Sequence, residues 1–71
     1  MARTNAQQKL GKKIKQLRLD AELSQERLGE MTGLDRTYIS GIERGVRNPS
    51  LKNIEKLAKS LNVKVSDLIE F

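Results

Sequence analysis

The chain has 71 residues, with 14 lysines and arginines against 9 aspartates and glutamates, and a formal net charge of +5 at pH 7. It contains no Cys, His or Trp, which excludes disulfide bridges, metal sites built from Cys or His, and catalysis by imidazole. No apolar run approaches the roughly 18 residues of a membrane-spanning helix, and the N-terminus lacks the apolar stretch of a signal peptide. We therefore expect one small domain over residues 1–71, located in the cytoplasm, without cofactor, metal, membrane or small-molecule ligand.

The charge is distributed unevenly along the chain. Residues 1–19 hold six basic side chains and no acidic ones, residues 20–43 hold six acidic and two basic ones, and residues 44–71 hold six basic and three acidic ones. Basic flanks around an acidic middle suit a protein that grips a polyanion with its ends and uses its middle for a more selective task. A solvated, lysine-rich surface would give the same total, so charge alone does not decide.

Apolar residues at helical spacing predict a first helix over about residues 5–20. Ser24 is a good N-cap for a second helix over residues 25–32, and Asp35 is a good N-cap for a third over residues 36–44. The second and third helices are short and are joined in about four residues, which is the spacing of a helix-turn-helix.

The last third of the chain predicts two more helices. Ser50 caps a fourth helix, whose apolar stripe has a clear period of 3.6 residues. Beyond it, Val63 and Val65 alternate as in a strand, whereas Ser66 and the next three residues have the pattern of an N-cap and one helical turn. We expect the short helix, and hence an all-α fold, a compact five-helix bundle.

The third predicted helix has a polar side that could reach DNA bases. Thr37, Ser40 and Gly41 lie opposite its apolar stripe, with Arg36 beside them at the helix start. A helix-turn-helix lets its first helix cross the DNA backbone while the second presents such side chains to the major groove.

The sequence over residues 23–45 resembles the phage repressor and Cro type of helix-turn-helix, also called the XRE family. LSQERL at 23–28 resembles the opening of the family's second helix, Gly33 its turn glycine, and ISGIERG at 39–45 the end of its recognition helix. NPS at 48–50 and the apolar stripe behind it resemble the helix that follows.

The resemblance extends from about Leu10 to Ile69 and implies both fold and function. It implies a lambda repressor-like DNA-binding domain, with the motif at about residues 24–44, that acts as a sequence-specific transcriptional regulator of double-stranded DNA. Within the family, DRTYIS at 35–40 followed by ERG at 43–45 is most similar to restriction-modification controller proteins, small dimeric regulators of their own operon and of the endonuclease gene.

The resemblance also implies a part for individual residues. Arg36 can fork onto the O6 and N7 atoms of a guanine, and the other predicted base contacts are Thr37, Ser40 and Gly41. Gln25, at the start of the second helix, matches the residue that holds a phosphate. The remaining predicted phosphate contacts are Tyr38, Arg44, Arg47, Asn48 and Lys52. Tyr38 could instead pack inward, and Arg44 could instead cap the end of its helix.

Arg18 and Glu43 match a pair that the family holds beneath its surface, so the resemblance implies a structural ion pair between them. Such a pair fixes the angle between helices and adds little net stability, but removing one partner typically costs about 3 to 5 kcal/mol. Gly29 departs from the family's usual Ala, at a cost of about 1 kcal/mol in helix propensity; it could allow the third helix to approach more closely.

A homodimer is expected from the geometry of DNA, because one short helix reads only a few base pairs. The predicted interface is the apolar cluster Val63, Val65, Leu68, Ile69 and Phe71. The alternative is that these residues close the core of the monomer itself.

Two other functions compete with DNA reading. Catalysis is not expected, because no nucleophile and base, carboxylate pair or phosphate loop has a persuasive spacing; Gly11-Lys12-Lys13 lacks the flanking residues of such a loop. A protein-interaction module, such as an antitoxin or coactivator domain, remains the alternative. The exposed polar side of the third helix favours DNA.

Overall fold

The computed structural model describes residues 5–69, which fold into five α-helices and no strand. They are α1 (Asn5–Asp20), α2 (Gln25–Thr32), α3 (Arg36–Glu43), α4 (Leu51–Ser60) and α5 (Val65–Ile69). The predicted all-α, five-helix fold is confirmed, and α3 ends one residue earlier than expected. None of the helices between residues 5 and 69 has both the length and the apolar character needed to cross a bilayer.

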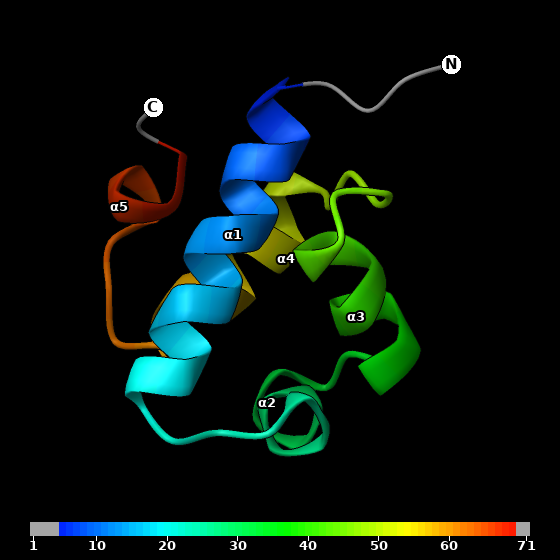
Figure 1. Cartoon of the computed structure of the whole chain (residues 1–71). Coiled ribbons are helices and arrows are strands. Elements are labelled where there is room, and N and C mark those ends of the chain that lie inside the picture. The colour runs from blue at the N-terminus through cyan, green and yellow to red at the C-terminus, as the bar shows by residue number, and fades with distance from the viewer. Residues whose placement is uncertain (1–4, 70–71) are drawn as a thin grey trace.

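The helices enclose a single core. Figure 1 shows α1 along the middle of the molecule, with α5 on one side, α3 on the other, and α2 crossing below. α1 packs against α3 and α5, α2 against α3 and α4, and α4 against α5. Every helix contributes to the set of fully buried large side chains, which are Ile14, Leu28, Ile39, Ile42, Leu57 and Leu68.

The ends of α2, α3 and α4 are fixed by local side-chain chemistry. Ser24, Asp35 and Ser50 each accept a hydrogen bond from a backbone N–H in the first turn of their helix, at 2.9, 3.1 and 3.2 Å. Gly33 ends α2 in the left-handed conformation, with φ of 78°, and its N–H donates to the Gly29 carbonyl at 2.8 Å. All three predicted N-caps are confirmed; Ser24 and Asp35 set where the two helices of the motif begin, and Ser50 sets the start of α4.

α5 begins differently from the prediction. The helix starts at Val65, so Ser66 lies inside its first turn and is not its cap. The carboxylate of Asp67 instead reaches back and accepts a hydrogen bond from the backbone N–H of Lys64 at 2.9 Å. An acidic side chain in the first turn satisfies that donor as the second half of a capping box does.

Gly29 lies where α2 closely approaches the turn that leads into α3. A Cβ atom at this position would lie 2.7 Å from the carbonyl oxygen of Leu34, in the turn that leads into α3. Because that oxygen belongs to the backbone, an alanine would require the turn itself to shift. Gly29 thus lowers the helix propensity of α2, but its lack of a side chain lets α2 pack tightly against the turn.

Candidate nucleic-acid interface

α3 separates an apolar inner side from a polar outer side. Ile39 and Ile42 are fully buried, whereas Arg36 and Thr37 are exposed and Ser40 is half-buried. Arg36 is the first residue of the helix, at the end that lies next to α2. The exposed guanidinium and hydroxyl groups are donors and acceptors of the kind that read base edges in a major groove.

Gly41, a predicted base contact, has a different environment. It is buried, and the side chain of Arg47 lies across it, so that a Cβ atom on Gly41 would come within 2.5 Å of the Arg47 Cγ. The backbone N–H groups of Val46 and Arg47 both donate to the Gly41 carbonyl, at 3.0 and 3.2 Å. The Arg47 side chain thus covers Gly41, and a base edge would reach Gly41 only if that side chain moved aside; the base contact of Gly41 stays a prediction.

In the same position, the Arg47 side chain lies over an aromatic ring. Its guanidinium carbon lies 5.6 Å from the centroid of the Tyr38 ring, within cation–π range. The Tyr38 hydroxyl accepts a hydrogen bond from Asn53 Nδ2 at 3.1 Å. Tyr38 thus packs partly inward and keeps a hydroxyl whose own proton can be donated outward. Sequence reasoning missed Asn53, because it lies 15 positions further along the chain, in α4, and only the tertiary fold brings it to Tyr38.

The other predicted phosphate contacts follow one edge of the molecule. Arg44, Asn48 and Lys52 are exposed, on the loop after α3 and in the first turn of α4. Arg44 takes the C-cap position through its backbone, its N–H bonding the Ser40 carbonyl at 3.0 Å. Its exposed side chain forms no recorded hydrogen bond within residues 5–69, so capping leaves the guanidinium available.

Arg18 and Glu43 form the predicted ion pair, which is nearly inaccessible to solvent. Arg18 Nε donates to Glu43 Oε2 at 2.7 Å and Nη2 donates to Oε1 at 3.0 Å, while Nη1 donates to the Leu23 carbonyl at 2.7 Å. The hydrogen bond that Arg18 donates to Glu43 raises the pKa of the Arg18 guanidinium, against the opposing effect of burial. The pair joins α1, the loop before α2, and the end of α3.

Gln25 belongs to this same network, which sequence reasoning did not anticipate. Its Nε2 donates to Glu43 Oε1 at 3.0 Å. The predicted phosphate ligand at the start of α2 is therefore tied to the buried ion pair.

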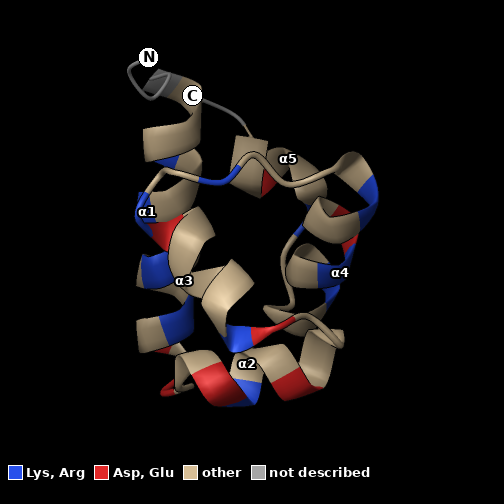
Figure 2. Cartoon of the chain, turned by 90° about the vertical axis from the view of Figure 1, so that its right-hand side faces the viewer, with Lys and Arg blue, Asp and Glu red and all other residues tan. Residues whose placement is uncertain are grey.

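The charge pattern of the sequence is visible in three dimensions. Figure 2 shows acidic residues gathered on α2, and lysines and arginines along α1, the loop after α3, and α4. The basic positions flank the mostly uncharged outer side of α3, as expected if the flanks hold a polyanion and α3 reads it.

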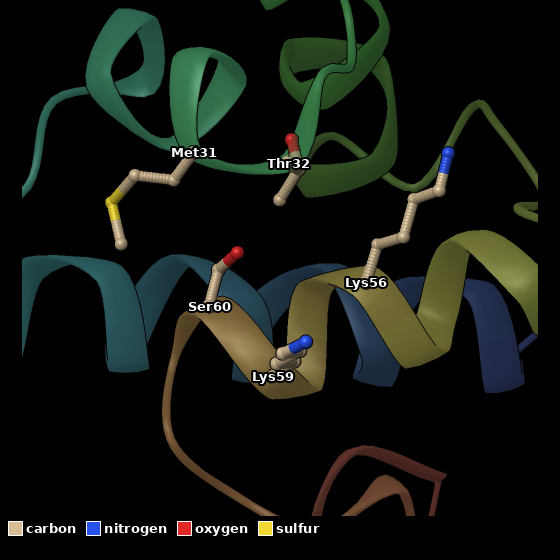
Figure 3. Close-up of a pocket in the computed structure, with 5 residues that line it drawn as sticks. All are labelled: Met31, Thr32, Lys56, Lys59 and Ser60. Carbon is tan, nitrogen blue, oxygen red and sulfur yellow. The ribbon is translucent and has the colours of Figure 1, made fainter.

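A hollow lies between the end of α2 and α4. It has a volume of about 550 Å³ and is lined by Met31, Thr32, Lys56, Lys59 and Ser60 (Figure 3). The Thr32 hydroxyl is engaged with the Leu28 carbonyl at 2.8 Å. The lining contains neither a carboxylate nor an imidazole, and residues 5–69 hold no acidic cluster able to bind a metal ion.

The predicted dimer interface is corrected by the burial of one of its members. Leu68 is completely buried in the core and cannot face a second copy. Val63 and Val65 are half-buried against the same core, while Ile69 is 44% exposed. Phe71 lies outside the described residues. Leu68 therefore closes the core of the monomer, and a contact between copies through Val63, Val65 or Ile69 stays a prediction.

The fold and the polar outer side of α3 define a class. A helix-turn-helix family model matches residues 14–68. The chain therefore belongs to the helix-turn-helix family of DNA-binding regulators. The chain is 53% identical over 62 residues to control protein C.BamHI of Bacillus amyloliquefaciens, a match that covers 86% of this chain and 76% of that protein.

Solved structures give the same result. The restriction-modification controller protein C.AhdI from Aeromonas hydrophila superposes with a TM-score of 0.85 at 47% identity, covering 87% of this chain and 94% of that one. The controller protein C.Esp1396I, solved as a tetramer in complex with its natural 35 base-pair operator, superposes with a TM-score of 0.84 at 40% identity, covering 94% and 88%. The resemblance to controller proteins is confirmed.

Proposed function

We propose that this chain is a restriction-modification controller: a sequence-specific regulator that lays α3 into the major groove of its operator. The observation that carries the proposal is the outer side of α3, where Arg36 and Thr37 are exposed at the helix start above a buried apolar side. The likeness to controller proteins supports a role in regulating its own operon and the endonuclease gene.

Base reading is assigned to the exposed polar side chains of α3. Arg36 can donate two hydrogen bonds to a guanine, a contact that typically contributes about 1 to 3 kcal/mol of discrimination against other bases. Thr37 and Ser40 carry hydroxyls that can bond a base or a phosphate. Because Gly41 is covered by Arg47, a base contact at Gly41 requires the Arg47 side chain to move aside.

Phosphate binding is assigned to the groups around α3. Arg44, Arg47, Asn48 and Lys52 follow the loop after α3 into α4, where they can track one DNA strand. Tyr38 supplies a hydroxyl, and Gln25 supplies its side-chain amide at the start of α2, where it is bonded to Glu43 at the end of α3.

We propose that two copies bind an inverted repeat, with half-sites about one helical turn, roughly 34 Å, apart. The exposed Ile69 and the half-buried Val63 and Val65 are the apolar side chains offered for the contact between copies. The operator-bound tetramer of C.Esp1396I supports multimeric binding. We further propose that residues 1–71 form one DNA-binding domain, which has no catalytic activity and works in the cytoplasm.

The test is selection from a random pool of double-stranded DNA, followed by affinity measurements on the enriched site and on scrambled DNA across a salt series. We expect an inverted-repeat site preferred by about three orders of magnitude or more, with affinity falling steeply as salt rises. Arg36→Ala should reduce the preference, and Arg27→Ala, on the exposed face of α2, should leave it unchanged. Weak binding, equal for every sequence, would refute the proposal and favour a protein-interaction module.

A further inference from the structure

One buried carboxylate receives donors from two other helices. Glu43, at the end of α3, accepts two hydrogen bonds from Arg18 of α1 and one from Gln25 of α2. Its side chain is only 3% exposed. The bond from Gln25 is not needed to satisfy Glu43, because Arg18 already reaches both carboxylate oxygens.

We propose that Glu43 is a positioning residue for phosphate binding: it holds the Gln25 amide in the orientation that a DNA phosphate requires. This inference rests on the proposed function. A neutral amide nitrogen carries two hydrogens; Glu43 takes one of them, and no recorded partner within residues 5–69 takes the other. That second hydrogen is left for an acceptor outside the protein, beside the backbone N–H groups of the first turn of α2, of which that of Arg27 is bonded to Ser24.

The charges make this arrangement compatible with a bound anion. The Glu43 carboxylate would be separated from the bound phosphate only by the Gln25 amide, and alone it would repel the phosphate. The Arg18 guanidinium lies 2.7 Å from Glu43 and offsets its charge. Glu43 therefore acts on the phosphate through the orientation of Gln25. Because Gln25 is held before DNA arrives, binding does not have to freeze its rotamers.

The experiment measures binding to the selected operator with single phosphates replaced, one at a time, by uncharged methylphosphonates. The variants of the full chain are Gln25→Ala, Glu43→Gln and Glu55→Gln. The last makes the same change of charge on the exposed face of α4 and serves as the matched control. All affinities are measured well below each variant's melting temperature.

We expect Gln25→Ala to weaken binding to unmodified DNA by about tenfold and to have no effect when one particular phosphate is already neutral. Glu43→Gln should show its loss at that same phosphate, whereas Glu55→Gln should show none there. A merely structural role for Glu43 predicts a loss spread over all phosphates, which would overturn the inference. So would Gln25→Ala binding the operator as tightly as the natural chain.

A second measurement covers the case in which Glu43→Gln does not fold. In the natural chain, the two side-chain amide protons of Gln25 are followed by ¹H–¹⁵N NMR. One should be held in the free protein, and the other should shift on adding operator DNA but not on adding DNA neutral at that phosphate. Averaged protons that DNA does not shift would overturn the inference while leaving sequence-specific binding, and so the proposed function, intact.

Discussion

Replacing Arg18 with methionine should destabilise the fold far more than it changes which DNA sequence is preferred. The substitution keeps most of the apolar stem but removes three hydrogen bonds, two to Glu43 and one to the Leu23 carbonyl. It leaves a buried carboxylate unpaired, at a cost of about 3 to 5 kcal/mol. A domain of this size has a total stability of about 4 to 10 kcal/mol, so the variant should lose a large part of it.

Thermal and urea unfolding followed by circular dichroism measure the effect. A loss of this size should lower the melting temperature by more than about 12 °C. The matched control is Arg27→Met, which removes an ion pair of two well-exposed side chains, Arg27 and Glu30, and should have almost no effect.

The double variant Arg18→Met with Glu43→Leu tests whether the loss of stability comes from the unpaired Glu43 carboxylate. Removing both charges takes away the unpaired carboxylate, so stability should recover to within about 1 to 2 kcal/mol of the natural chain. If the double variant is no more stable than Arg18→Met alone, the cost does not come from the unpaired charge. A folded Arg18→Met variant with a changed operator preference would show that Arg18 is more than structural.

Three further outcomes are expected. Gly11→Ala should destabilise the chain by about 1 to 3 kcal/mol, measured by the same melts, because the added Cβ would overlap the Ile42 carbonyl oxygen at the end of α3. Affinity for the operator should stay nearly constant between about pH 6 and 8, since the chain has no histidine and the raised pKa of Arg18 keeps that side chain charged. Fluorescence anisotropy at a series of pH values measures this affinity, and a steep change within that range would contradict the prediction. Ile69→Glu should weaken self-association in sedimentation experiments without lowering the melting temperature, and an unchanged dimer would remove Ile69 from the interface.

The sequence predicted the fold well where the signals are local. Ser24, Asp35 and Ser50 act as caps because their side chains reach N–H groups within the next three residues, and such contacts can be read from spacing alone. The Arg18–Glu43 pair was predicted only through resemblance to a family, because 25 residues separate the partners.

The site was predicted less completely, and the reason is tertiary packing. The sequence placed Gly41 on the outer side of α3, but Arg47 folds back over it from the following loop. Leu68 belonged to a cluster that could face outward or inward, and only the position of α5 against α1 and α4 decides for the core. The bonds of Gln25 and Asn53 likewise join residues on different helices.

The shortness of α3 ties DNA reading to the folding of the whole domain. The helix has eight residues, and isolated helices shorter than about 12 to 15 residues are marginal in water. Its sequence, RTYISGIE, is rich in β-branched and other weak helix formers. A partly unfolded chain would therefore have no reading surface at all. In a cell, a destabilising change anywhere in the core would act as a lower dose of regulator, because each remaining folded molecule keeps its affinity while fewer of them exist.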